Sequence, residues 1–175
     1  MQNLLDNYYQ MVTRVDALCR RIQDALSGRI TCSEGCSSCC TAITLFPVEA
    51  AALNAALEAL PDAQQAAIRR HVDERAGGER CPLLEDHRCL LYAARPLICR
   101  THGLPIIYTE GSERKVDCCP RNLSDGEQPV SGSAIIDLDR FNTLLVAVNA
   151  LFLSHAGAGD LPERLTIADA LKVKP

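Results

Sequence analysis

Hydrophobic residues recur every three or four positions near both ends of the chain. This spacing is typical of an amphipathic helix, and it predicts one helix over residues 4–26, with Gly28 as a suitable C-cap. A second strong helix is predicted from about Asp139 to His155. Cys19 lies in the hydrophobic stripe of the first helix, so we expect it to pack in the core.

Three further helices are predicted from their end signals. Pro47 opens an alanine-rich helix that carries Glu49 in its first turn and runs to Leu60. A more polar helix starts at Pro61–Asp62 and stops at Gly77–Gly78, and we expect its Arg69–His71 run on a solvated face. Residues 166–169 resemble a capping box and predict a short final helix.

The middle of the chain lacks such periodicity. Residues 31–41 form a cysteine-rich segment that is too small and polar to be core, and residues 81–103 contain short elements interrupted by prolines. Residues 105–117 predict a short β-hairpin, and residues 122–133 a polar loop. The predicted fold class is therefore mainly α, with a small β-hairpin and an irregular, metal-organised centre between the helices.

Length and composition predict one globular domain. The 175 residues are 47% hydrophobic and 23% charged, which is typical of a chain that buries its own core. Within residues 1–175 we expect an N-terminal helix (1–29), a cysteine-cluster metal-binding region (31–120) and C-terminal helices (134–175). The net charge of −4 disfavours nucleic acid as a partner.

The first residues have neither the basic nor the hydrophobic region of a secretory signal. No hydrophobic run approaches the ~20 residues of a membrane helix, so we expect no membrane partner. These features predict a cytoplasmic protein, whose thiols stay reduced. The ten cysteines are then better explained as metal ligands than as disulfides.

Nine cysteines remain when Cys19 is set aside, and they are clustered. The first cluster reads Cys-x3-Cys-x2-Cys-Cys, in which Cys39 and Cys40 are adjacent and chelate one ion only awkwardly. Either a helix, on which Cys32, Cys36 and Cys39 would lie within roughly 60° of one another, or a tight loop at Gly35 brings three thiols together. A closed zinc site takes four ligands, so the cysteines suffice for two sites.

The residues around the cysteines are less informative. His71, His87 and His155 are expected in surface or core positions, and His102 is expected to be a structural hydrogen-bonding group rather than a ligand. Arg95 and Arg100 flank Cys99. They either offset the negative charge of metal-bound thiolates or form ordinary surface ion pairs, and the sequence does not separate these readings.

The cysteine blocks resemble a known family. Cys32-Ser-Glu-Gly-Cys36-Ser-Ser-Cys39-Cys40, Cys81-Pro-Leu, Cys89-Leu-Leu-Tyr and Arg95-Pro-Leu-Ile-Cys99-Arg are similar to the YkgJ-type cysteine-cluster family, zinc- or iron-chelating domains named for a CxxCxxCC motif. The resemblance runs from about Thr31 to Pro120, and Cys119 matches the late cysteine of the family, although Cys118 stands beside it. One departure is that three residues, rather than two, separate the first two cysteines. The resemblance implies metal chelation by the motif cysteines.

Zinc is the favoured metal, because a spread of cysteines over loops and helices suits closed tetrahedral sites. Iron or an iron–sulfur cluster is the alternative, with an electron-transfer or redox-enzyme role. A radical-SAM enzyme is disfavoured because Ser38, not an aromatic residue, precedes the third cysteine. Whether the chain is an enzyme stays open, and a protein partner or a homo-oligomer is compatible with its helices. The expected metal ligands are Cys32, Cys36, Cys39, Cys40, Cys81, Cys89, Cys99 and Cys119.

Overall fold

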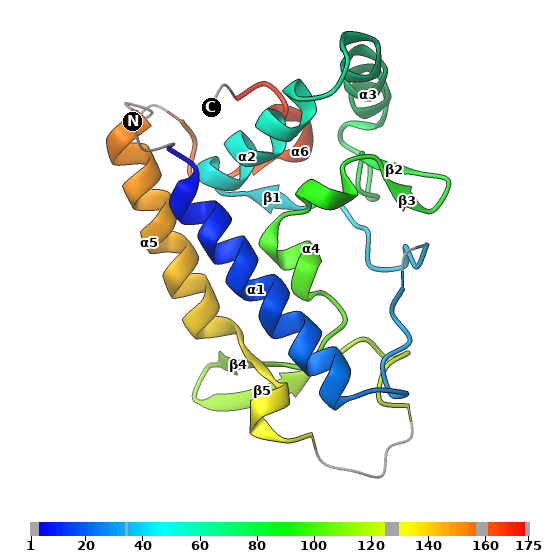
Figure 1. Ribbon diagram of the computed structural model, residues 1–175, viewed down its shortest axis with the longest axis vertical. Coiled ribbons are helices and arrows are strands. Elements are labelled where there is room, and N and C mark those ends of the chain that lie inside the picture. Colours follow the sequence, from blue (N-terminus) through cyan, green and yellow to red (C-terminus); the bar gives the residue numbers. More distant parts are fainter. Residues whose placement is uncertain (1–3, 34, 125–129, 157–160, 174–175) are drawn as a thin grey trace.

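The computed structural model describes residues 4–33, 35–124, 130–156 and 161–173 (Figure 1). Helices make up most of the regular structure, as the sequence predicts. They are α1 (Asp6–Ala25), α2 (Pro47–Glu58), α3 (Asp62–Arg75), α4 (Leu97–Thr101), α5 (Leu138–Ala156) and α6 (Ile167–Ala170), with short 3-10 turns η1 (Tyr92–Ala94) and η2 (Gly132–Ala134). The strands are β1 (Thr44–Leu45), β2 (Leu84–Glu85), β3 (Arg88–Cys89), β4 (Ile106–Glu110), β5 (Glu113–Asp117), β6 (Ile136–Asp137) and β7 (Leu165–Thr166).

Helix α2 is the centre of the core. It packs against α3, α5 and α6, and its residues 47–54 are all buried (Figure 1). The small alanine side chains allow these neighbours to approach closely on several sides. The amide nitrogen of Val48 donates a hydrogen bond to Asn149 Oδ1 of α5 at 3.1 Å, which satisfies a free N–H in the first turn of α2.

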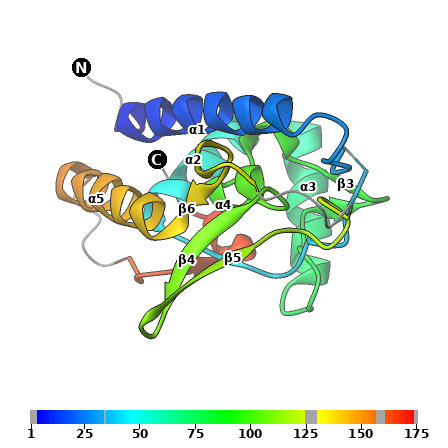
Figure 2. The ribbon, with the colours of Figure 1, turned by 90° about the horizontal axis from the view of Figure 1, so that it is seen from below.

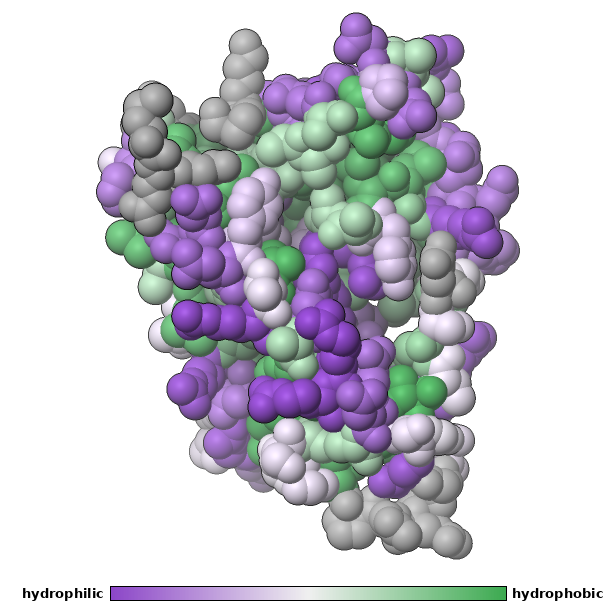
Figure 3. All heavy atoms as spheres, in the orientation of Figure 1, coloured by the Kyte–Doolittle hydropathy of each residue, from purple (hydrophilic) through white to green (hydrophobic). Residues whose placement is uncertain are grey.

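Helix α1 lies beside α4 and α5 and presents its hydrophobic stripe to them (Figure 1). Its buried residues have the predicted spacing and include Cys19, which is 7% exposed. The Cys19 thiol donates to the carbonyl of Arg100 at 3.6 Å, so its expected place in the core is confirmed. Hydrophilic side chains cover the solvent side of the C-terminal half of α1 (Figure 3).

Small sheets complete the fold. The predicted hairpin is present as the antiparallel pair β4–β5, and β6 adds a parallel strand to β4, directly before α5 (Figure 2). The antiparallel pairs β1–β7 and β2–β3 were not predicted, because strands of two residues have no detectable alternation. The predicted start of the last helix is confirmed, since Thr166 Oγ1 accepts from the Asp169 amide at 3.1 Å.

The expectation of a solvated Arg69–His71 face is wrong for two of the three residues. Arg69 reaches inward and donates to the carbonyl of Leu171 and to Asn54 Oδ1. His71 is buried and contacts the carbonyl of Leu84 at 3.2 Å and the carboxylate of Glu85. Both side chains connect α3 to neighbouring segments. Their partners are distant in sequence, so the local run of charged residues could not predict these contacts.

The buried carboxylate of Glu49 joins α2 to α4. Its Oε2 accepts from the Phe46 amide at 3.3 Å, and its Oε1 accepts from the Leu97 amide at 3.1 Å. Burial raises the pKa of Glu49, although these two amide donors lower it. Because Leu97 begins the helix that carries Cys99, Glu49 sets the position of that cysteine relative to the core.

Replacing Glu49 by alanine leaves the Phe46 and Leu97 amides without acceptors. We expect the free energy of unfolding to fall by about 2 kcal/mol or more, because each buried donor left without a partner costs about 1–3 kcal/mol. Urea unfolding at fixed metal loading measures the change. Glu74→Ala, on the exposed face of α3, is the control and should change stability by less than about 0.5 kcal/mol. Equal unfolding midpoints for the two variants would contradict the role given to Glu49.

Candidate metal centre

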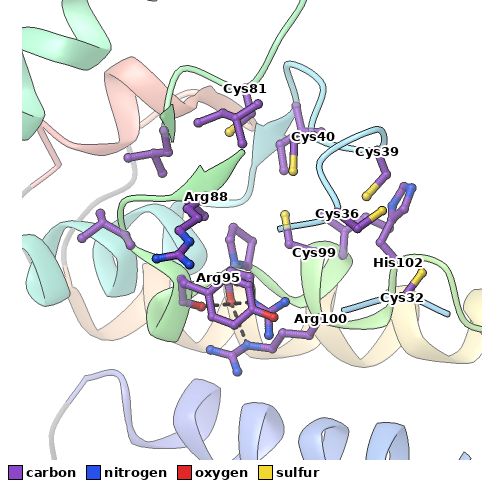
Figure 4. Close-up of a pocket in the computed structure, with 18 of the residues that line it drawn as sticks. Cys32, Cys36, Cys39, Cys40, Cys81, Arg88, Arg95, Cys99, Arg100 and His102 are labelled. Carbon is purple, nitrogen blue, oxygen red and sulfur yellow. Dashed lines mark hydrogen bonds between the residues drawn. The ribbon is translucent and has the colours of Figure 1, made fainter. Parts of the chain in front are cut away.

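Seven of the eight predicted ligands line one pocket of about 410 Å³. Figure 4 shows the thiols of Cys40, from the cysteine-rich loop, and Cys99, from α4, directed toward each other, and the thiol of Cys36 directed toward Cys39. Cys119, the eighth, lies next to Cys32 rather than in the pocket lining, because both flank Gly103. The structure thus brings together cysteines that are up to 87 positions apart in sequence, from Cys32 to Cys119.

One group of four thiols is held by regular structure and is called the inner set: Cys40, Cys81, Cys89 and Cys99. The Cys81 amide donates to the Cys40 carbonyl at 3.1 Å, beside the antiparallel bridge between Thr41 and Arg80. The β2–β3 hairpin then turns the chain back, so that Cys89 pairs with Leu84. Cys99 approaches from α4.

The inner thiols are close enough to influence one another electrostatically. Burial is the main cause that raises the pKa of Cys99 to about 12, and the thiols of Cys81, Cys89 and Cys40 raise it further. Burial likewise raises the pKa of Cys81 to about 11, with added contributions from Cys89 and Cys40. These thiols therefore carry protons at neutral pH when no cation shares the space with them.

The other group is called the outer set: Cys32, Cys36, Cys39 and Cys119. Its central contact is the amide of Asn122, which is 2% exposed. Asn122 Nδ2 donates to Cys32 Sγ at 3.3 Å and to the Gly103 carbonyl at 2.6 Å, while Oδ1 accepts from the Thr31 amide at 2.8 Å. One side chain therefore ties together the three segments around Cys32 and Cys119.

The outer thiols lie in a more varied environment. Burial raises the pKa of Cys32, the hydrogen bond from Asn122 lowers it, and Cys119 raises it again. The pKa of Cys36 is lowered, first by the Ser38 hydroxyl and amide and then by Arg121, whose guanidinium lies 3.8 Å from the sulfur. Ser38, Arg121 and Asn122 thus each place a polar side chain in contact with a sulfur of the outer set.

The loop between Cys36 and Cys40 is fixed by residues outside it. The Ser37 hydroxyl hydrogen-bonds to His87 Nδ1 at 2.9 Å, and Arg80 Nη2 donates to the Ser37 carbonyl at 2.7 Å. His87 stands at the tip of the β2–β3 hairpin with a φ of 64°, a left-handed conformation that is rare for a residue other than glycine. The hairpin therefore holds the first cysteine cluster in place as well as carrying Cys89.

The two arginines that flank Cys99 have different surroundings. Arg100 Nη1 donates to both carboxylate oxygens of Asp16 at 2.9–3.0 Å, and the guanidinium also donates to the Ala93 and Arg95 carbonyls, so these hydrogen bonds go to oxygen rather than to sulfur. Arg95 stacks on the ring of Tyr92, with 3.6 Å from guanidinium to centroid. Burial raises the pKa of Cys89, and the positive charge of Arg95 opposes this effect in part. Charge compensation of a thiolate thus applies to Arg95, whereas Arg100 links α4 to α1.

Sequence reasoning missed Asn122, Arg121 and Gly103. Asn122 and Arg121 follow the late Cys-Cys-Pro block directly, which is the signal that could have indicated them. Gly103 adopts a φ of +89°, and an added Cβ would stand 2.7 Å from Cys32 Sγ. His102 is exposed and lines the pocket.

The donor chemistry fits a thiophilic metal. All ten cysteines are free thiols, and two groups of four match the ligand number of closed zinc sites and of cubane iron–sulfur clusters. Across the described ranges, no three Cys, His, Asp or Glu side chains are spaced as ligands of one ion. The thiols are therefore gathered in two groups without being drawn in to coordination distance.

Comparison with known proteins supplies the family. The family model CxxCxxCC, described as a putative zinc- or iron-chelating domain, matches residues 31–121, a little over half of the chain. The chain belongs to this family. The resemblance drawn from the cysteine blocks is thereby confirmed. No curated protein and no solved structure matches the chain. In the part of the chain that the structure describes, every helix is too short or too polar to span a membrane.

Gly103→Ala tests the close contact with Cys32. The new methyl group would collide with Cys32 Sγ, so we expect the outer set to lose its metal and metal content to fall by up to one ion per chain. Gly77→Ala is the matched control: its φ of +80° gives similar backbone strain, about 1 kcal/mol, but its Cβ meets nothing within 4 Å. Metal analysis and melting temperature are measured together. Equal metal loss in both variants would refute the contact's role.

Proposed function

We propose that the protein is a metal-chelating protein that binds two zinc ions, one at the inner set and one at the outer set. The observation that carries this proposal is the gathering of the eight thiols, with Cys40 joined to Cys81 by a backbone hydrogen bond on one side and Cys32 held by Asn122 on the other. The family match to a zinc- or iron-chelating domain supports metal binding by residues 31–121. Four thiolates per ion satisfy a closed tetrahedral zinc site.

Zinc is favoured over an iron–sulfur cluster because each set reaches four ligands without an added ion such as sulfide. The inner cysteines come from a loop end, the start of a hairpin, a strand and a helix. Bound zinc would cross-link these segments, and structural zinc contributes on the order of 10 kcal/mol to folding. An iron–sulfur cluster at the inner set is the second candidate, because its thiols and buried position suit such a cluster as well.

Polar residues around the two sets would stabilise bound metal by offsetting charge and by orienting the thiolates. A bound zinc ion replaces the thiol protons and cancels part of the mutual repulsion of four thiolates. Arg95 and Arg80 then offset remaining charge at Cys89, Cys40 and Cys81, and Asn122 orients Cys32 by its hydrogen bond. The ten free thiols support a reducing, cytoplasmic compartment as part of the same proposal.

Metal content, acid-labile sulfide and the visible absorption spectrum of anaerobically purified protein test the proposal. We expect two zinc ions per chain, no sulfide and no colour. Cys99→Ser should remove one ion from the inner set and Cys36→Ser one from the outer set, whereas Cys118→Ser, beside Cys119 but outside both sets, should retain two. Iron with matching sulfide and a brown colour would establish the iron–sulfur candidate instead. Metal-free wild-type protein would overturn metal chelation altogether.

The raised thiol pKa values predict how metal binding depends on pH. With pKa values of about 11 for Cys81 and about 12 for Cys99, both thiols are still protonated at pH 9 in the metal-free chain. Zinc must displace these protons, so binding weakens as the pH falls. At pH 9, where an ordinary thiol is already mostly ionised, we expect zinc to release at least two protons per inner site. Titration of zinc into weakly buffered protein measures the release, and fewer than one proton would contradict the prediction.

A further inference from the structure

The pocket that seven of the eight cysteines line is larger than the space needed for two metal ions. Its volume of about 410 Å³ lies in the range of small-molecule sites. Besides the thiols, hydrophobic side chains form part of its lining, among them Leu83, Leu91 and Ile98. Leu83 and Leu91 belong to the core and are 2% and 5% exposed, whereas Ile98 is 37% exposed, so the pocket extends from the surface to the core.

One wall of the pocket is cationic. Figure 4 shows Arg88, Arg95 and Arg100 along one side of the pocket and the labelled cysteines along the other. Arg100 is neutralised by Asp16. Arg88 and Arg95 make this wall locally positive, although the chain as a whole has a net charge of −4.

Arg88 differs from the other two arginines of this wall. Arg95 stacks on Tyr92 and donates to its carbonyl, and Arg100 is bound to Asp16. Among the described residues, the Arg88 guanidinium has no hydrogen-bond or ion-pair partner, although it lines the pocket. It is also not the cation that acts on its neighbour Cys89, because that influence comes from Arg95.

We propose that this pocket is a binding site for a small organic anion with a hydrophobic body. The anionic group would pair with Arg88 and Arg95, and the hydrophobic part would lie against Leu91 and Ile98. Guanidinium groups bind carboxylates and phosphates through paired hydrogen bonds, which explains why two of them face one hydrophobic space. This inference goes beyond metal chelation, since it assigns a second ligand to the region.

Calorimetric titration of the metal-loaded protein with octanoate, acetate and octanol tests the proposal. We expect octanoate to bind once per chain and at least tenfold more tightly than acetate, which lacks the hydrophobic body, or octanol, which lacks the charge. Arg88→Ala should weaken octanoate binding at least tenfold. Arg70→Ala removes a solvent-facing arginine of α3 outside this pocket and serves as the control that leaves binding unchanged.

Metal analysis of the same samples separates the two proposals. If Arg88 instead compensates the charge of the thiolates, Arg88→Ala lowers the metal content and the anion inference is wrong. Equal affinity for octanoate and octanol, unchanged octanoate binding in Arg88→Ala, or no octanoate binding to protein that carries its metal would each overturn it. Loss of metal from wild-type protein would count against the proposed function and not against this pocket.

Discussion

Mutual repulsion between clustered thiolates is the constraint on which the centre of this structure depends. Eight cysteines lie in two neighbouring groups, and the charge of each inner thiol raises the pKa of Cys99 further above the effect of burial. Such a gathering is stable only while the thiols hold protons or share a cation. The same constraint accounts for three features: the irregular middle of the chain, its membership of a metal-chelating family, and the arginines that lie near the thiols.

The remainder of the fold brings the cysteine segments together through a few polar contacts. Helix α2 is buried on most sides. The carboxylate of Glu49 accepts a hydrogen bond from the Leu97 amide, which fixes the position of α4, and therefore of Cys99, relative to α2. The β2–β3 hairpin contacts α3 through the hydrogen bond between His71 and the Leu84 carbonyl. It contacts the first cysteine loop through the hydrogen bond between His87 and Ser37. Asn122 performs the same task for the outer set. Each contact uses a buried or half-buried polar group to fix a segment that has little hydrophobic surface of its own.

The sequence predicts the parts of this structure that rest on local pattern. The stripe from Tyr8 to Ile22, the proline at the start of α2 and the Thr166 cap are local signals, and the helices follow them. The grouping of the cysteines is different, because it depends on which segments meet in space. Cys40 pairs with Cys81 across a bridge between distant residues, and Asn122 reaches Thr31. Spacing along the chain does not encode such contacts, so the sequence did not predict which cysteines lie near one another.

X-ray absorption at the metal edge of the protein as isolated tests the central claim most directly, because it reports the atoms bound to the metal. The account predicts four sulfur ligands for each ion, at about 2.3 Å if the metal is zinc. The same shell should lose sulfur in Cys99→Ser protein that has been reloaded with metal. A first shell made mainly of oxygen and nitrogen atoms would contradict coordination by the two groups of thiols.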